Sequence, residues 1–221
     1  MRISNLLLLT AFFFLYLLFV YMCPTFAQDE PFSEYKPWSS LTEEEKKGLR
    51  KRWTKEKVKE VVKALREGKP LPKFVKKIPL SEEDRKSFSF SVFEQNVKNY
   101  DLRGISLINE DLQNVKLRFI HLEGAQLIRA NLKGADLIGA NLEGADLIEA
   151  NLKRVNLVGA NLEGADLRGA SLKGAVLAEA NLKGTNLFKA SFDWTYLWHV
   201  NLGEAKNIRY IEWRSRLFKN R

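Results

Sequence analysis

The chain has 221 residues, of which 45% are hydrophobic and 29% charged, enough for one substantial domain with extensions. Its single cysteine, Cys23, excludes an intramolecular disulfide and a metal site built from cysteines. The net charge of +9 is unevenly spread. Residues 28–86 hold 17 basic and 12 acidic residues, residues 87–207 hold 13 and 14, and residues 208–221 hold five and one. The basic charge therefore belongs to the two flanks of a nearly neutral middle.

Residues 1–27 are typical of a targeting segment, with Arg2 before an uncharged, Leu- and Phe-rich run at 6–22. Thr25-Phe26-Ala27 then offers small residues to a secretory peptidase. The run would make about 25 Å of helix, slightly short for a bilayer. A cleaved signal peptide and a retained membrane anchor therefore both stay open, whereas a buried helix is disfavoured because no polar face interrupts the run. In either case the acidic residues that follow predict an extracytoplasmic location, periplasmic or secreted.

Residues 28–86 are predicted to form a linker and a basic helical extension. Residues 42–45, Thr-Glu-Glu-Glu, have the pattern of a capping box. The helical stretch that follows reaches about Glu67 and stops before Gly68. We expect a bend near Thr54, because the apolar residues on its two sides do not share one face. A second, shorter helix is predicted to begin at Ser81.

The first of these helices is strongly basic, which permits two interpretations. It attracts an anionic membrane or nucleic acid, or it is a solvated helix face on which lysines alternate with glutamates. The second interpretation is favoured. The basic residues are Lys46, Lys47, Arg50, Lys51, Arg52, Lys55, Lys57 and Lys59.

A five-residue period begins at Leu102, where a leucine recurs at every fifth position to Leu202 with one replacement, Phe192. Alanine lies two residues before it at 13 of 17 positions from Ala125 to Ala205. This period fits neither the 3.6-residue turn of a helix nor the alternation of a strand. It is typical of a solenoid of stacked coils.

With the units Ala130-Asn131-Leu132 and Ala135-Asp136-Leu137, the repeat resembles the pentapeptide-repeat family, whose consensus is Ala-Asp/Asn-Leu-x-x. The resemblance covers residues 100–205. It implies an all-β solenoid, a right-handed quadrilateral β-helix with four pentapeptides in each coil. The Leu and the residue two before it point inward in this fold, and the other three face outward. Val92 and Val97 keep the same register, so the repeat domain is predicted to span 87–207.

The residue after each leucine alternates between charged and mostly apolar with a period of ten. Such a period stacks like on like only if each coil holds an even number of pentapeptides. Four per coil give separate columns, which are Glu123, Glu143 and Glu163; Lys133, Lys153 and Lys173; Ile128 and Ile148; and Ile138 and Val158. An apolar column is either a surface for a partner or the product of repeat duplication, with the charges serving solubility. The basic helix could also cover part of one.

Aromatic residues gather where the repeat ends, and residues 208–221 are predicted to form a short basic helix. A solenoid must cap its last coil, so capping is the favoured role for these residues. A homodimer through the C-terminal end, as the family resemblance implies, is the rival. The candidate partner-binding residues are Ile128, Ile138, Ile148, Val158, Phe188, Trp194, Tyr196 and Trp198.

Catalytic, cofactor-binding and metal-binding residues are not predicted. The sequence has no nucleophile–base grouping and no glycine-rich phosphate loop, and its two histidines, His121 and His199, lie apart. The favoured function is a non-enzymatic, extracytoplasmic interaction scaffold for an unknown protein partner, with residues 6–22 available for membrane association. The resemblance also implies DNA mimicry toward type II topoisomerases, but a nearly neutral repeat and an export signal argue against it. Binding of anionic lipid by the basic flanks is a further alternative, and nucleic acid is disfavoured.

Overall fold

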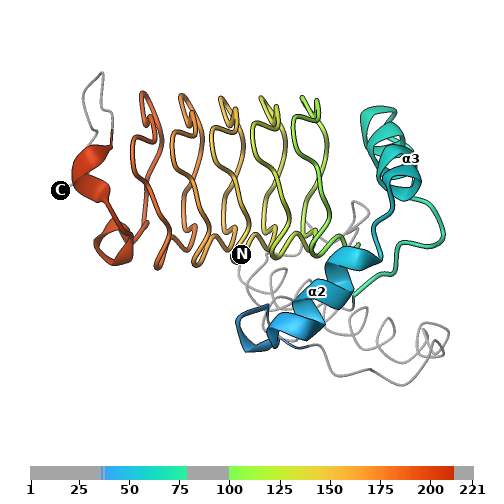
Figure 1. Ribbon diagram of the computed structural model, residues 1–221. Helices are drawn as coiled ribbons and strands as arrows, with labels where there is room; N and C mark the ends of the chain where they lie inside the picture. The colour runs from blue at the N-terminus through green and yellow to red at the C-terminus, as the bar shows by residue number, and fades with distance from the viewer. Residues whose placement is uncertain (1–35, 37, 79–99, 212–221) are drawn as a thin grey trace, which may run out of the picture. The chain divides into compact units, whose positions relative to one another are not determined.

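The computed structural model describes residue 36, residues 38–78 and residues 100–211 (Figure 1). Several predictions concern other residues: the signal peptide or anchor at 1–27, the helix start at Ser81, the upstream coil at 87–99 and most of the C-terminal helix at 208–221. These lie outside the described residues and stay predictions.

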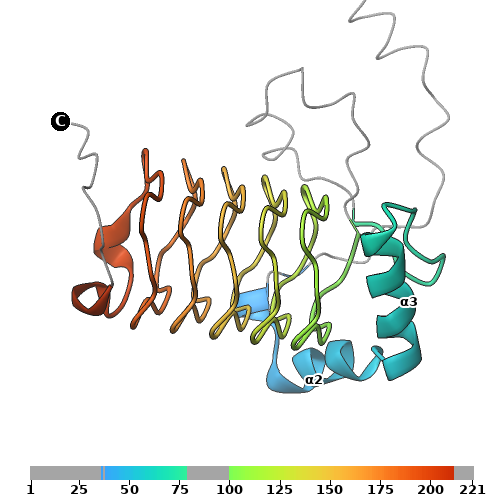
Figure 2. The same cartoon turned by 90° about the horizontal axis from the view of Figure 1, so that it is seen from above.

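The repeat forms a solenoid in which each coil takes 20 residues. Parallel bridges join residues 20 apart, from Asp101 with His121 to Asn186 with Lys206. Backbone hydrogen bonds follow the same period, for example from Leu102 N to His121 O at 2.8 Å. Four pentapeptides per coil are thus confirmed, and residues 101–200 make five coils (Figures 1 and 2). The bridges are isolated residues between turns, so no long strand is formed.

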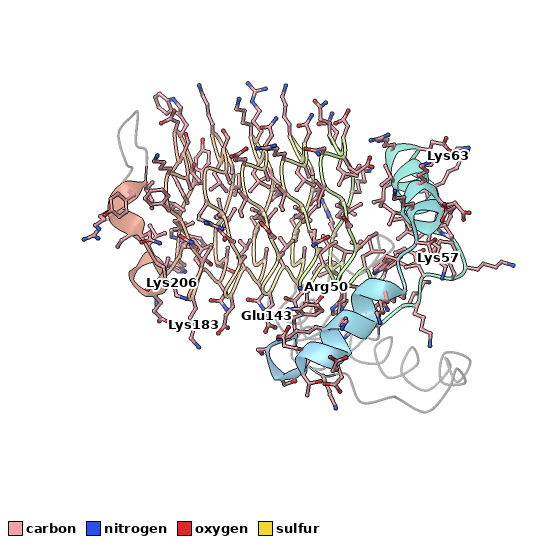
Figure 3. The ribbon with its side chains drawn as sticks, viewed as in Figure 1. Arg50, Lys57, Lys63, Glu143, Lys183 and Lys206 are labelled. Carbon is pink, nitrogen blue, oxygen red and sulfur yellow. The ribbon has the colours of Figure 1, made fainter. Side chains whose placement is uncertain are left out.

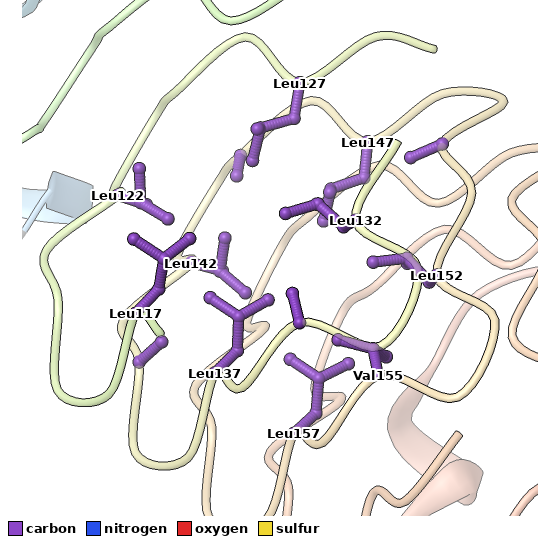
Figure 4. Packing of buried hydrophobic residues seen from close by; sticks show 14 of the residues in the cluster. Leu117, Leu122, Leu127, Leu132, Leu137, Leu142, Leu147, Leu152, Val155 and Leu157 are labelled. Carbon is purple, nitrogen blue, oxygen red and sulfur yellow. The ribbon is translucent and has the colours of Figure 1, made fainter. Parts of the chain in front are cut away.

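The core is a column of side chains along the solenoid axis. The leucines at the repeated positions are buried from Leu102 to Leu187, as is nearly every alanine two residues before them, whereas Leu197 and Leu202 are partly buried. Figure 4 shows the leucines of successive coils stacked in rows, such as Leu117, Leu137 and Leu157. Burial of each leucine stabilises the fold by about 1.5–3 kcal/mol. Thr185 occupies an alanine position without leaving a buried polar group unpaired, because its Oγ1 donates a hydrogen bond to Leu162 O at 2.8 Å.

The outward Asn and Asp residues hold the turns. Their side-chain oxygens accept from the backbone amide two residues on, as Asn141 Oδ1 does from Glu143 N at 3.1 Å. The asparagines of neighbouring coils also join each other, with Asn161 Nδ2 donating to Asn141 Oδ1 at 3.1 Å. These residues are therefore structural.

The N-terminal extension contains the 3-10 helix η2 (Trp38–Ser40) and the helices α2 (Glu43–Lys51) and α3 (Lys55–Arg66). The predicted capping box is confirmed, since Thr42 accepts from Glu45 N and the Glu45 side chain accepts from Thr42 N. The break expected near Thr54 is also confirmed, because Thr54 is the N-cap of α3.

Helix α3 packs against the first coil. Val61, Val62 and Ala64 are buried and belong to the same hydrophobic cluster as the leucines of the solenoid. Residues after α3 return to the coil edge, where Lys77 pairs antiparallel with Tyr100. The extension is thus an N-terminal cap, a role that the sequence analysis had assigned only to the C-terminal end.

Side chains of this cap also complete the hydrogen bonding of the first coil. In later coils, outward backbone carbonyls accept hydrogen bonds from amides of the coil before, as His121 O does from Leu102 N. In the first coil, the corresponding carbonyls accept from the extension instead. The bonds run from Arg52 Nη2 to Asp101 O (3.1 Å), from Trp53 Nε1 to Arg103 O (2.9 Å) and from Arg66 Nε to Asp111 O (2.7 Å). The three side chains thus satisfy part of the edge of the first described coil.

Two short 3-10 helices cover the other end, η4 (Leu202–Glu204) and η5 (Ile208–Tyr210). Edge amides of the last coil donate to this segment, with Leu187 N bound to Lys206 O between the two helices and Lys189 N bound to Tyr210 O of η5, both at 3.1 Å. The described start of the predicted C-terminal helix is therefore a 3-10 turn and not an α-helix.

Candidate functional site on the outer faces of the solenoid

The predicted partner-binding residues fall into two columns on different sides of the coil. Ile138, Val158, Ala178 and Trp198 follow one another at the same position in successive coils, as the bonds from Gly139 N to Val158 O and from Glu179 N to Trp198 O show (both 2.9 Å). This column is apolar from the second coil onward, whereas Arg118 holds its position in the first coil. The column of Ile128, Ile148 and Phe188 is interrupted by Arg168, which pairs with Asp166 at 2.8 Å. The structure thus separates a continuous apolar column from a broken one.

The continuous column ends in a row of exposed aromatic side chains, Trp194, Tyr196 and Trp198, which we call the aromatic row. They are 60%, 64% and 51% exposed. They alternate along one side of the last coil while Thr195 and Leu197 take the inward positions. The expectation that these three cap the coil is wrong, because capping side chains are buried against the last coil and these are mostly exposed.

The coil before the aromatic row carries small residues at the matching positions, Gly174, Val176 and Ala178. Tyr196 bridges directly to Val176. Large aromatic side chains therefore lie next to a strip of small apolar residues in the coil before, whose backbone is about 4.8 Å away, the spacing of neighbouring strands. This step is an apolar feature on an otherwise polar surface.

Two further aromatic contacts occur in the last coil, one beside the aromatic row and one on the opposite side. His199 stacks on Trp198 with ring centroids 4.0 Å apart and planes at 20°. Phe188 instead meets Tyr210 edge to face at 5.0 Å. Phe188 thus packs against the C-terminal turn, whereas the aromatic row stays open to solvent.

A second feature of the outer surface was missed by the sequence analysis. Residues 38–51, which we call the strap, lie along the acidic column. Trp38 is only 6% exposed, and Ser39 N donates to Glu143 Oε1 at 2.7 Å. Glu123 and Glu143 are buried although they hold outward positions. The basic extension was considered as a cover for an apolar strip, but it covers the acidic column and the first coil.

Trp38 rests on a column of glycines beside the acidic column. A Cβ at Gly124 would lie 1.9 Å from the Trp38 ring, and one at Gly144 would lie 3.0 Å from it. Figure 3 shows Arg50 of α2 and Glu143 of the solenoid on this side of the coils. The five positions of this column are all glycine, Gly104, Gly124, Gly144, Gly164 and Gly184.

An ion cluster fastens the far end of the strap. Arg52 holds both carboxylate oxygens of Asp101, at 2.7 and 2.8 Å, and Arg103 Nε binds the same group at 3.0 Å. Burial alone would raise the pKa of the Asp101 carboxyl, but the hydrogen bonds and charges of Arg52 and Arg103 outweigh it and hold that pKa far below its usual range. Asp101 is therefore a charged, structural group.

The described residues offer neither a metal site nor a membrane-spanning helix. Within residues 36, 38–78 and 100–211, three or more His, Cys, Asp or Glu side chains nowhere gather as a metal site would require. The helices of that same part are all too short or too polar to cross a membrane.

A coil of 20 residues with leucine and alanine inside defines the class of quadrilateral β-solenoids. The model of the family described as "Pentapeptide repeats" matches in eight copies, over residues 101–144, 125–164, 156–192 and 165–203. The chain belongs to the pentapeptide repeat family, which implies a right-handed coil. Members of this family are generally structural or interaction scaffolds.

Solved pentapeptide repeat proteins are similar over the repeat. One from the cyanobacterium Cyanothece 51142 is 29% identical, covers 49% of this chain and 90% of its own, and has a TM-score of 0.42. One from the thylakoid lumen of Arabidopsis thaliana is 30% identical over 45% and 69%, with a TM-score of 0.32. One from Nostoc Pcc 7120 is 30% identical over 52% and 84%, with a TM-score of 0.37. A comparison with curated proteins finds no match.

Proposed function

We propose that this protein is a non-enzymatic, extracytoplasmic interaction scaffold that binds a protein partner through the aromatic row. The main evidence is the high exposure of Trp194, Tyr196 and Trp198 on one side of one coil. Among the described residues, five of the seven exposed large hydrophobic side chains lie between residues 194 and 210. Such aromatic groups bury large areas at low entropic cost and are enriched at binding hot spots.

The shape of the surface supports a protein as the ligand. The aromatic row and the low strip of Gly174, Val176 and Ala178 form a step that a complementary apolar side chain or helix can fill. Charged residues such as Lys173 and Glu179 lie beside this step, which suits the polar rim of an interface. The solenoid supplies rigidity, because each coil is held by backbone bonds to both neighbours.

The test compares the full chain with the variant Trp194→Ser, Tyr196→Ser, Trp198→Ser as bait in a pull-down from a crosslinked envelope fraction. We expect at least a tenfold loss of the partner's recovery. The control is Phe74→Ser, which removes another exposed aromatic, 40% exposed, from the opposite end. Equal recovery by the aromatic-row variant would overturn the proposal.

Export is the second element of the proposal and is supported by the sequence of residues 1–27. A mature N-terminus at Gln28, measured by mass spectrometry, identifies a cleaved signal peptide, whereas an intact Met1 in the membrane fraction identifies an anchor. Recovery of the whole protein from the soluble cytoplasm would contradict export.

The alternatives make different predictions. Anionic lipid binding by the basic flanks predicts co-sedimentation with phosphatidylglycerol vesicles that falls as salt rises. DNA mimicry, which rests on the family resemblance, predicts an effect on gyrase supercoiling. The described solenoid carries exposed lysines at Lys133, Lys153 and Lys173, which a mimic of an anionic rod would not need.

A further inference from the structure

We propose that the seat of Trp38 is a second binding groove, which the strap occupies in cis and an aromatic, basic segment of a protein partner occupies in trans. The groove is made of Gly124, Gly144 and the carboxylate of Glu143. It lies on a different part of the solenoid from the aromatic row, so it stands or fails independently of the function proposed above.

The glycines show that this seat is built for a ring. The turn position needs a positive φ on every side of the coil, yet the other sides use residues such as Asn114, Arg154 and Lys189 with φ of 55° to 57°. Backbone conformation alone therefore does not demand glycine. At Gly124 and Gly144 the demand comes from the indole, since any Cβ would meet the Trp38 ring.

Polar groups add specificity to the seat. The backbone amide that follows the ring, Ser39 N, donates to Glu143 Oε1 at 2.7 Å. Lys46 Nζ and Arg50 Cζ lie 5.9 and 5.7 Å from the Trp38 ring, within cation–π distance. The groove thus recognises three things together: an aromatic side chain, a free main-chain amide after it, and nearby positive charge.

The strap is attached in a way that allows it to leave without unfolding the cap. Trp38 is the one buried residue among the described residues of the strap, and α2 has no buried side chain. By contrast α3 buries Val61, Val62 and Ala64. Segments with few buried contacts open locally at lower free energy than the whole fold, so α2 and η2 can detach while α3 stays.

Because the strap is covalently linked to the groove, a partner segment must compete with it for binding. A tethered segment acts at an effective concentration of order millimolar, so a partner segment of equal affinity binds poorly until the strap is released. The apparent affinity of the groove for a partner falls in proportion to the fraction of molecules in which the strap is open. The strap therefore limits access to the groove.

The experiment measures binding of a labelled synthetic peptide with the sequence of residues 34–51, which includes Lys46 and Arg50, to the full chain by fluorescence anisotropy. The strap is released by Trp38→Ala or, with the indole kept, by Ser39→Pro, which removes the amide donated to Glu143. We expect the released chain to bind the peptide at least tenfold more tightly than the unchanged chain. A peptide with alanine in place of Trp38 should bind at least tenfold more weakly.

The location of binding is tested by Gly124→Asn in the released chain, with Gly164→Asn as the control. Asparagine tolerates a positive φ, and no described atom lies within 4 Å of a Cβ at Gly164. We expect loss of binding for the first and a change within twofold for the second. Failure of the peptide to bind any released chain, or equal binding after Gly124→Asn, would overturn the proposal.

Discussion

The two ends of the solenoid are closed in different ways. At the N-terminal end a helix buries valines against the first described coil, and Arg52, Trp53 and Arg66 donate hydrogen bonds to carbonyls on its edge. At the C-terminal end short 3-10 turns accept edge amides, and the aromatic side chains beside them stay exposed. The first end is specialised for stability, whereas the second leaves apolar surface available for binding.

The largest effect should come from disrupting the N-terminal cap. Val61→Asp places an unpaired charge at a side chain that is 0% exposed, and we expect a loss of about 4 kcal/mol in the free energy of unfolding. Lys63→Asp on the exposed face of α3 is the control and should change it by less than about 0.5 kcal/mol. Urea denaturation followed by circular dichroism measures both; similar losses would contradict the cap.

Asp101→Asn should be nearly as damaging, because it leaves the charges of Arg52 and Arg103 without their buried partner. We expect a loss of about 3 kcal/mol at neutral pH. Asp111→Asn, on an exposed residue of the same coil, should cost less than about 1 kcal/mol.

The same variant tests the low pKa of Asp101. A carboxyl whose pKa is lower in the folded state stabilises the protein above its unfolded pKa of about 3.9 and loses that contribution as the pH falls below it. The difference in unfolding free energy between the original chain and Asp101→Asn should therefore be constant from pH 5 to 7 and shrink below about pH 4. A difference that stays constant down to pH 2 would refute the ion cluster.

Substitution of two glycines in one column compares a position covered by the strap, Gly124, with an uncovered one, Gly164. Gly124→Ala and Gly164→Ala both pay about 1 kcal/mol for alanine at a positive φ. Only Gly124→Ala also drives a Cβ into the Trp38 ring, so it should cost about 2 kcal/mol more. Hydrogen exchange should accelerate in residues 38–51 of the first variant alone; no difference between the two would mean that the strap does not rest there.

The smallest effect is expected at the C-terminal end. Trp198→Ser removes a side chain that is half exposed, so the unfolding free energy should stay within about 0.5 kcal/mol. Partner recovery should nevertheless fall. A large loss of stability would show that the aromatic row is a cap after all, and that the two ends are more alike than their contacts indicate.

Much of the fold was readable in the sequence because the five-residue period repeats one local solution. Leu102 and the leucines at every fifth position after it indicate the core. The charge alternation requires an even number of pentapeptides in each coil, in agreement with the four that the family resemblance implies. The capping box at Thr42 and the break at Thr54 were readable for the same reason, since caps depend on neighbours in sequence. Of the candidate site, the aromatic residues were found, but their role as caps was wrong for Trp194, Tyr196 and Trp198.

The strap could not be predicted, because its contacts join residues about 100 positions apart, such as Ser39 and Glu143. The one available signal was the unbroken glycine column from Gly104 to Gly184, in a turn position where other sides tolerate larger residues. Glycine there could equally satisfy the turn, so only the position of Trp38 distinguishes the two reasons.

The sequence by itself thus determined the period and an even number of pentapeptides in each coil, and the family resemblance added the inward residues and the four sides. Each of these depends on contacts between neighbouring or identical units. The tertiary structure alone decided which outward residues are covered. Glu143 and Trp198 hold the same place in their pentapeptides, yet one is buried beneath the strap and the other projects into solvent. That difference arises from a segment outside the repeat, whose packing the repeat pattern does not encode.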